Sequence, residues 1–218
     1  MIAAHHSAMR TSWPTPLYVG VAFVGSSVQN NGGILSGFTS SSYAKLPFTF
    51  AAGATHLEAV CRFSFNGFAS GFSDAGVWGC VGDGDAFTPF YFPNQTNAIS
   101  AYVSSNGTSW DICNGGASPR ILYYATAAHR EYTCKLVYSN TNGYSFYRYE
   151  NGAWEYCGNL ADTRSPYGSS STQPHLGNNR GRSSSLNGTI DLNYTYLVRD
   201  GALFWEGAAG AFKNVARL

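Results

Sequence analysis

The sequence predicts an all-β protein, a sandwich of two antiparallel sheets packed face to face. Its 218 residues include 15 Tyr, 14 Phe and 25 Gly, while only 11% are charged. Aromatic side chains favour pleated, half-buried strands, and Gly and Asn favour turns. The other two observations are an alternation of apolar and polar residues and a series of Asn-Gly and Asp-Gly turn signals. Roughly a dozen short strands at regular spacing are typical of a sandwich.

The first third of the chain contains four predicted strands. Residues 18–24 are apolar and predict an edge strand or a contact with a neighbouring subunit. Residues 34–38 and 43–46 are two more strands, separated by a run of serines. Residues 57–65 form the first long strand, because alternate positions are apolar. The side chains expected on its inner face are Leu57, Ala59, Cys61, Phe63 and Phe65.

The glycine- and aromatic-rich middle of the chain predicts strands at residues 76–81, 87–92 and 99–104. Asn106-Gly107 then marks a turn, and Trp110 lies on the returning segment. We expect Trp110 to pack between the sheets, as we do Trp154, because each follows a hairpin turn and is large and apolar.

Two further Asn-Gly pairs predict a meander of three strands. Residues 131–139 alternate, and Asn142-Gly143 and Asn151-Gly152 connect them to strands at 144–149 and 154–156. Asn-Gly between alternating segments is the strongest short-range signal for a tight hairpin. The inward side chains expected on the first strand are Tyr132, Cys134, Leu136 and Tyr138.

The last predicted feature is a hairpin over residues 188–207, preceded by a polar loop at 160–185 with a short strand near 175–177. Asp200-Gly201 supplies the turn. Alternation predicts one buried face, made of Ile190, Leu192, Tyr194, Tyr196 and Val198, and one polar face, made of Asp191, Asn193, Thr195 and Arg199. We expect three parts: a lead-in or anchoring segment at 1–27, a sandwich at 28–207 and a tail, helical or disordered, at 208–218.

Charge and cysteine content exclude several classes of protein. The net charge is +1, and no basic stripe exists to neutralise phosphates, so we expect no nucleic-acid partner. No segment reaches the ~18 apolar residues that a membrane span needs. The five cysteines are an odd number without a Cys-x-x-Cys pair, which favours buried free thiols over a zinc site or a full set of disulfides.

Four segments resemble one family. Residues 32–47, 57–66, 99–112 and 188–207 are similar, in order and type, to segments of the laminin-G-like, concanavalin A-like domains of bacteriophage structural proteins. The first of them resembles the family's opening hairpin. The resemblance implies a two-sheet antiparallel jelly-roll sandwich and a role in the virion, as tail fibre, tail tip or head decoration.

The resemblance also implies partners and a location. We expect a non-enzymatic virion structural protein that is assembled in the bacterial host cytoplasm, contacts other virion proteins and forms a homo-oligomer. Contact with host-surface glycans is an additional function that this role allows. The alternative is a lectin-like carbohydrate-binding module of a bacterial surface protein. A glycoside hydrolase is a third, weaker reading, since the Glu-x-Asp-x-x-Glu pattern of related glucanases is absent, as is a Gly-x-Ser-x-Gly elbow. We therefore predict no catalytic residues.

Candidate binding residues cluster around the glycine-rich region. An aromatic ring beside amides can stack on a sugar and hydrogen-bond it, which makes Trp78, Tyr91, Asn94 and Gln95 candidates for a glycan site. The competing interpretation is that the aromatics are core and the amides form turns. Asp83 and Asp85 lie in a Gly-Asp-Gly-Asp run that offers oxygen ligands to Ca²⁺, although a hydrated turn explains the run equally well. No other cofactor is expected.

Overall fold

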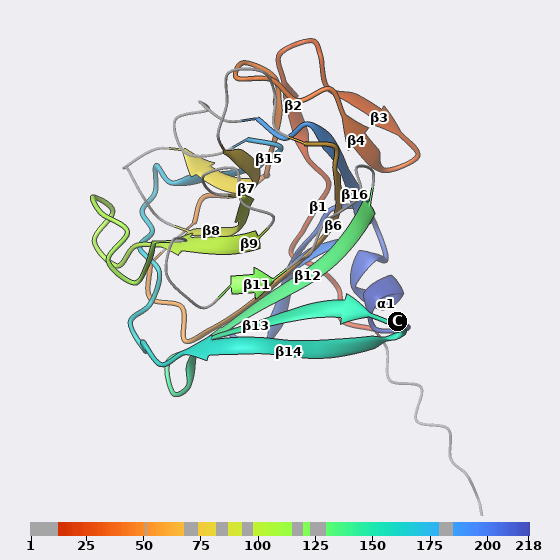
Figure 1. Ribbon diagram of the computed structural model, residues 1–218. Coiled ribbons are helices and arrows are strands. Elements are labelled where there is room, and N and C mark those ends of the chain that lie inside the picture. Colours follow the sequence, from red (N-terminus) through yellow and green to blue (C-terminus); the bar gives the residue numbers. More distant parts are fainter. Residues whose placement is uncertain are drawn as a thin grey trace, which may run out of the picture.

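The computed structural model describes residues 13–50, 52–67, 74–81, 87–92, 98–114, 120–122, 130–178 and 185–218. Their backbone forms two β-sheets that face each other and one short helix, α1 (Ala211–Val215) (Figure 1). Neighbouring strands are antiparallel, apart from one parallel pair at the edge of the larger sheet. The predicted fold class is confirmed: this is an all-β, concanavalin A-like jelly-roll sandwich.

The larger sheet has nine described strands. Seven lie side by side in the order β1 (Tyr18–Val19), β17 (Ala202–Glu206), β16 (Gly188–Arg199), β6 (His56–Phe65), β12 (Arg130–Ser139), β13 (Gly143–Glu150) and β14 (Ala153–Leu160). A small hairpin of β3 (Gln29–Asn31) and β4 (Ile34–Ser36) joins the sheet through pairing of β4 with β16.

The smaller sheet has eight described strands. Seven run in the order β10 (Cys113–Asn114), β9 (Ala98–Val103), β8 (Phe87–Phe92), β7 (Ala75–Val81), β15 (Gln173–Leu176), β5 (Tyr43–Lys45) and β2 (Ala22–Val24). The eighth, β11 (Arg120–Leu122), pairs with β9.

The core fills the space between the two sheets with large aromatic side chains. Trp78 of the smaller sheet and Trp205 of the larger sheet are fully buried, with ring centroids 5.5 Å apart in an edge-to-face arrangement. Phe63, Phe90 and Tyr132 are equally buried around them. The inward residues expected on β6 and β12 are all buried, so alternation correctly assigned the faces of both long strands.

The predicted meander is confirmed. β12, β13 and β14 are consecutive antiparallel strands, joined by turns at Asn142-Gly143 and Asn151-Gly152. Asn151 has a φ of 51° and Gly152 a φ of 82°, the left-handed pair that a tight hairpin of this twist requires. Asp200 and Gly201, with φ values of 50° and 80°, form the same turn between β16 and β17.

The face assignment for β16 is correct only for its first half. Between two paired positions on β6, Arg62 and Val60, the chain advances two residues, whereas the partners on β16, Asp191 and Tyr196, are five residues apart. Three extra residues, an odd number, move the following side chains to the opposite face of the sheet. Tyr196 therefore lies outside the sandwich, where it was expected inside. The bulge has its own hydrogen bond, which the Thr195 hydroxyl donates to the Asp191 carbonyl oxygen over 2.7 Å.

The predicted opening hairpin is not a hairpin. β4 pairs with β3 and β16 in the larger sheet, whereas β5 pairs with β2 and β15 in the smaller sheet. Only a single bridge, Thr39 to Ser42, closes the serine-rich turn between them. This turn therefore carries the chain from one sheet to the other.

The described part of the lead-in belongs to the sandwich. β1 and β2 are the outermost strands of the larger and the smaller sheet, and the Trp205 indole donates a hydrogen bond to the Gly20 carbonyl oxygen over 2.8 Å. The tail forms α1, which lies on the face of the larger sheet that points away from the smaller one (Figure 1). No helix among the described residues is long and apolar enough to cross a membrane.

Candidate functional site

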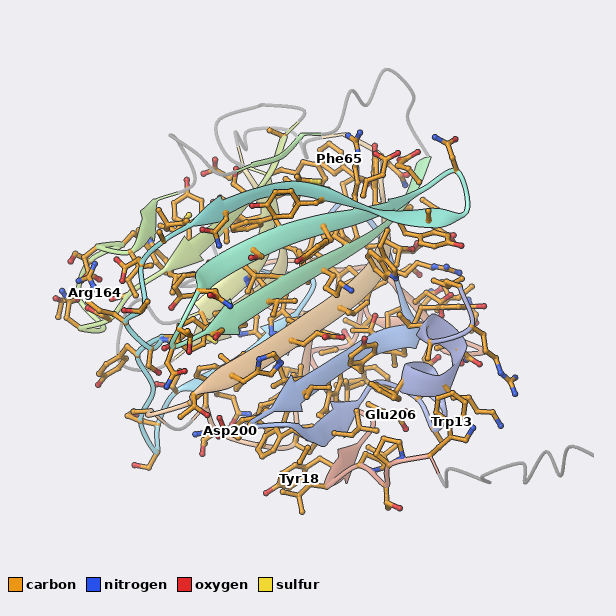
Figure 2. The ribbon with its side chains drawn as sticks, turned by 90° about the horizontal axis from the view of Figure 1, so that it is seen from below. Trp13, Tyr18, Phe65, Arg164, Asp200 and Glu206 are labelled. Atoms are coloured by element: carbon orange, nitrogen blue, oxygen red, sulfur yellow. The ribbon has the colours of Figure 1, made fainter. Side chains whose placement is uncertain are left out.

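The outer face of the larger sheet carries a row of side chains that the strand register brings together. Tyr196, Val60, Lys135, Tyr147 and Tyr156 occupy adjacent paired positions on β16, β6, β12, β13 and β14. Figure 2 looks onto this face and shows these strands side by side, with α1 at one end. Since side chains at paired positions point to the same side of a sheet, the whole row lies on the outer face; α1 covers Tyr196 and Val60, and Lys135, Tyr147 and Tyr156 remain accessible to water.

Four aromatic rings at the β13–β14 edge of this face form what we call the aromatic platform: Tyr147, Tyr149, Trp154 and Tyr156. Tyr147 and Tyr156 are paired across the strands with ring centroids 5.6 Å apart, and Tyr149 and Trp154 with centroids 5.5 Å apart. Both pairs are edge-to-face, which leaves ring surface open to water. Tyr156 is 61% exposed and the other three rings are partly exposed.

Lys135 lies against this platform. Its ammonium nitrogen is 4.4 Å from the centroid of the Trp154 ring and 4.9 Å from that of Tyr147. Cations are attracted to aromatic ring faces at such distances, and the attraction holds the long side chain in one place. Trp154 itself lies on the outer face of the sheet; the expectation that it packs between the sheets is wrong.

A groove of about 360 Å³ runs from the platform toward α1. The sheet contributes Glu58, Lys135, Trp154 and Tyr196 to its walls, and α1 contributes Phe212 and Val215. The Tyr196 hydroxyl donates a hydrogen bond to the Glu58 carboxylate. Burial, and then the neighbouring Glu58 charge, raise the pKa of Tyr196, so its hydroxyl stays protonated and remains a donor.

Several contacts fix the platform in position. The Tyr149 hydroxyl donates a hydrogen bond over 2.6 Å to the carbonyl oxygen of Leu218, which lies beyond α1. Arg148 and Glu155, on neighbouring residues of the same two strands, form an ion pair of 2.8 Å. Rings held in this way lose little conformational entropy when a ligand binds, which favours recognition.

The structure places two of the expected glycan residues in packed surroundings. Trp78 is 1% exposed, between Phe90 and Trp205, so it does not offer the open ring that sugar stacking requires. Tyr91 is 7% exposed and lies on the opposite face of β8 from Phe90, with its ring 4.8 Å from that of Tyr102. The Trp110 ring contacts Tyr102, with the two ring centroids 5.2 Å apart. Trp110 therefore lies on the outer face of the smaller sheet with Tyr91 and Tyr102, and the expectation that it packs between the sheets is wrong.

The remaining expected site residues, Asn94, Gln95, Asp83 and Asp85, lie outside the described residues. Within the part of the chain that the structure describes, no three potential metal-ligating side chains (His, Cys, Asp or Glu) lie together.

Sequence reasoning missed the platform although its signal is present. The strand at 143–150 has aromatics at both even and odd positions, Tyr144 and Phe146 against Tyr147 and Tyr149. Only one set can fill the core of a two-sheet sandwich, so the other set must lie outside. An apolar strand with aromatics on both faces is the pattern that predicts an outer aromatic surface.

Comparisons with known proteins agree with the sandwich fold and go no further. No protein-family model matches the chain, and no curated protein matches its sequence. Among solved structures, a heptameric SAP-like pentraxin from Limulus polyphemus is 13% identical, with a TM-score of 0.44 over 88% of this chain and 80% of that one. The carbohydrate recognition domain of Emp46p is 11% identical, with a TM-score of 0.45 over 77% and 83% of the two chains.

Domain 4 of AbnA, an extracellular GH43 arabinanase from Geobacillus stearothermophilus that was solved with arabinotriose, is 13% identical, with a TM-score of 0.46 over 88% of this chain and 82% of that one. Likeness at this level describes architecture, and we take no functional argument from it.

Proposed function

We propose that this protein is a non-enzymatic carbohydrate-binding module that binds glycan on the outer face of its larger sheet, at the aromatic platform. The observation that carries the proposal is the set of water-accessible rings of Tyr147, Trp154 and Tyr156, of which Trp154 also lines a groove that contains Lys135 and Glu58. Exposed, preordered aromatic surface is unfavourable in water unless something covers it.

The chemistry of the platform suits a sugar. A pyranose presents apolar C–H groups on its faces and hydroxyls around its rim, so it stacks on an aromatic ring and needs polar partners beside that ring. Tyr156 and Tyr147 supply the rings, and Lys135 and Glu58 supply a donor and an acceptor in the adjoining groove.

The groove also favours binding over hydrolysis. A glycosidase requires two carboxyl groups about 5–10 Å apart across the sugar. Among the described residues that line the groove, Glu58 is the single carboxylate, and it already accepts the Tyr196 hydroxyl. This supports a module that holds its ligand without cleaving it.

The place of the module in a larger assembly stays a prediction. A role in a bacteriophage virion rests on the sequence resemblance alone, and glycan binding would serve that role by contact with the host surface. Glycan binding also fits the alternative, a lectin-like module of a bacterial surface protein. The site favours this alternative, because a lectin-like module requires only the platform and no virion partner.

Glycan-array binding with two platform variants tests the proposal. We expect the wild-type protein to bind a set of glycans, and Trp154→Ala and Tyr156→Ala to weaken that binding at least about tenfold, because loss of a stacked ring costs about 1–3 kcal/mol in comparable aromatic platforms. Trp110→Ala, on the other sheet, is the matched control and should bind normally.

Thermal unfolding of each variant separates a lost contact from a lost fold. The proposal fails if the wild-type protein binds no glycan, or if both folded platform variants bind as the wild type does.

A further inference from the structure

On the outer face of the larger sheet, Lys135 is a cation that forms no ion pair with any residue that the structure describes. Its ammonium group makes cation–π contacts with Trp154 and Tyr147, and no carboxylate of the described residues lies within 4.0 Å of it. Ring faces attract the charge but accept none of its N–H groups in a strong hydrogen bond, so donors remain for a ligand.

Two other cations on these strands, Arg62 and Arg148, have described side chains, and both are paired within the protein. Arg148 forms its ion pair with Glu155. The Arg62 guanidinium lies 3.5 Å from the centroid of the Tyr194 ring and 3.6 Å from Glu131. Among the cations of β6, β12 and β13 whose side chains the structure describes, Lys135 is therefore the one whose charge is left for an anion.

Glu58 restricts where that anion can lie. It lines the same groove, its carboxylate is engaged by Tyr196, and it forms no ion pair with Lys135 among the described contacts. A second negative charge near Glu58 is repelled, while sugar hydroxyls can donate to it. The groove thus offers an anion position at the platform end and a hydroxyl position at the Tyr196 end.

We propose, on the basis of the proposed function, that the glycan is acidic: a polysaccharide of uronic acid residues whose carboxylate pairs with Lys135 while a sugar ring stacks on the platform. One carboxylate and several hydroxyls on one ring match the one cation and the one carboxylate among the described residues that line the groove, together with the aromatic rings beside it. The competing explanation is structural: the Lys135 stem covers apolar ring surface and its charge has no ligand.

Calorimetry with a matched pair of ligands tests the inference. Polygalacturonate and alginate are compared with the same polymers after chemical reduction of the carboxyl groups to alcohols. We expect the wild-type protein to bind at least one uronate about tenfold more tightly than its reduced form, as one charge-assisted hydrogen bond provides. This preference should shrink when salt rises from low to high concentration.

Variants then locate the preference. Lys135→Met keeps the apolar stem and should bind both forms alike, whereas Lys135→Arg should keep the preference. Lys45→Met removes an equal charge from an exposed position on β5 of the smaller sheet and is the control. Near-ultraviolet circular dichroism and thermal unfolding confirm that each variant is folded.

The outcomes separate the two proposals. If neutral glycans, or the reduced polymers, bind as tightly as the uronates, the acidic-ligand inference is wrong and the binding module stands. A uronate preference that persists in folded Lys135→Met also overturns the inference. If no glycan of either kind binds, the proposed function fails and the inference fails with it.

Discussion

The five cysteine side chains differ in how far solvent reaches them. Cys61, Cys80, Cys113 and Cys134 are buried free thiols, as expected, and Cys157 is partly exposed at a bulge in β14. Burial raises the pKa of Cys61 and of Cys80 to about 12. Since the thiolate is the reactive form, these groups are inert near neutral pH in the folded protein.

Reaction with a thiol reagent at pH 8 checks this difference. We expect one thiol per folded chain to react, more slowly than free cysteine because burial also raises the pKa of Cys157, and the other four to react only after unfolding in guanidinium chloride. Cys157→Ser should remove the reaction of the folded protein. Rapid labelling of two or more native thiols would contradict the buried arrangement.

Among the elements, α1 depends on one buried carboxylate for its position. Glu206, 4% exposed at the end of β17, accepts hydrogen bonds from the backbone N–H of Gly210 over 3.0 Å and of Phe212 over 2.8 Å. Figure 2 shows Glu206 beside the helix. The helix covers Tyr196, which the β16 bulge places outside the sandwich, and Val60, its paired neighbour on β6.

Glu206→Ala should therefore destabilise the protein by about 1–3 kcal/mol, because two backbone donors lose their partner. Urea unfolding measures the change, and hydrogen exchange should be faster for the amides of α1. Glu131→Ala is the control; its side chain is 62% exposed, and its removal should change stability by less than about 0.5 kcal/mol. An unchanged free energy of unfolding for Glu206→Ala would show that the helix is held by its apolar contacts alone.

Strand β16 shows which features of the fold the sequence does not predict. Local signals assigned β6, β12, β13 and the Asp200-Gly201 turn correctly, because alternation and turn chemistry act over a few residues. The bulge in β16 has no such signal: it becomes visible only from the register against β6, and it reverses the face of Tyr196. The serine-rich crossing from β4 to β5 has the same cause, since a turn does not determine which sheet the next strand joins.

The candidate site was missed for a related reason. Composition pointed to aromatics beside amides, Trp78 and Tyr91 with Asn94 and Gln95, since neighbours in sequence are all that a single chain displays. The candidate site instead combines Lys135 with Tyr147 and Trp154 of the platform, on three strands that only the meander register brings together. Its sequence signal, aromatics on both faces of one strand, is usable once the strand is known to have one buried face.

At the scale of the whole molecule, two parts of the surface carry exposed apolar side chains. The outer face of the larger sheet carries the platform and groove. The lead-in carries exposed apolar groups: Leu17, Val19 and Phe23 are 65%, 51% and 47% exposed, and Trp13, which is 47% exposed, packs edge-to-face against Phe212 of α1. β1 and β2 are the edges of the two sheets, and only two residues join them, so these edges border one side of the molecule.

Unpaired sheet edges and clustered exposed apolar side chains both favour association with another chain. Following the sequence prediction of a homo-oligomer, we expect the protein to self-associate through this side. Light scattering of the wild-type protein should give a mass of two or more chains, and Leu17→Ser combined with Val19→Ser should lower it to that of one chain. Ile34→Ser, at a 44% exposed residue of β4, is the control and should leave the mass unchanged.

A monomeric wild-type protein at high concentration would contradict the prediction, and these side chains would then be free for a different partner protein. Because the platform lies at β13–β14, on the opposite edge of the larger sheet from β1, such an oligomer would leave every platform open and gain affinity for a polymeric glycan from several simultaneous contacts.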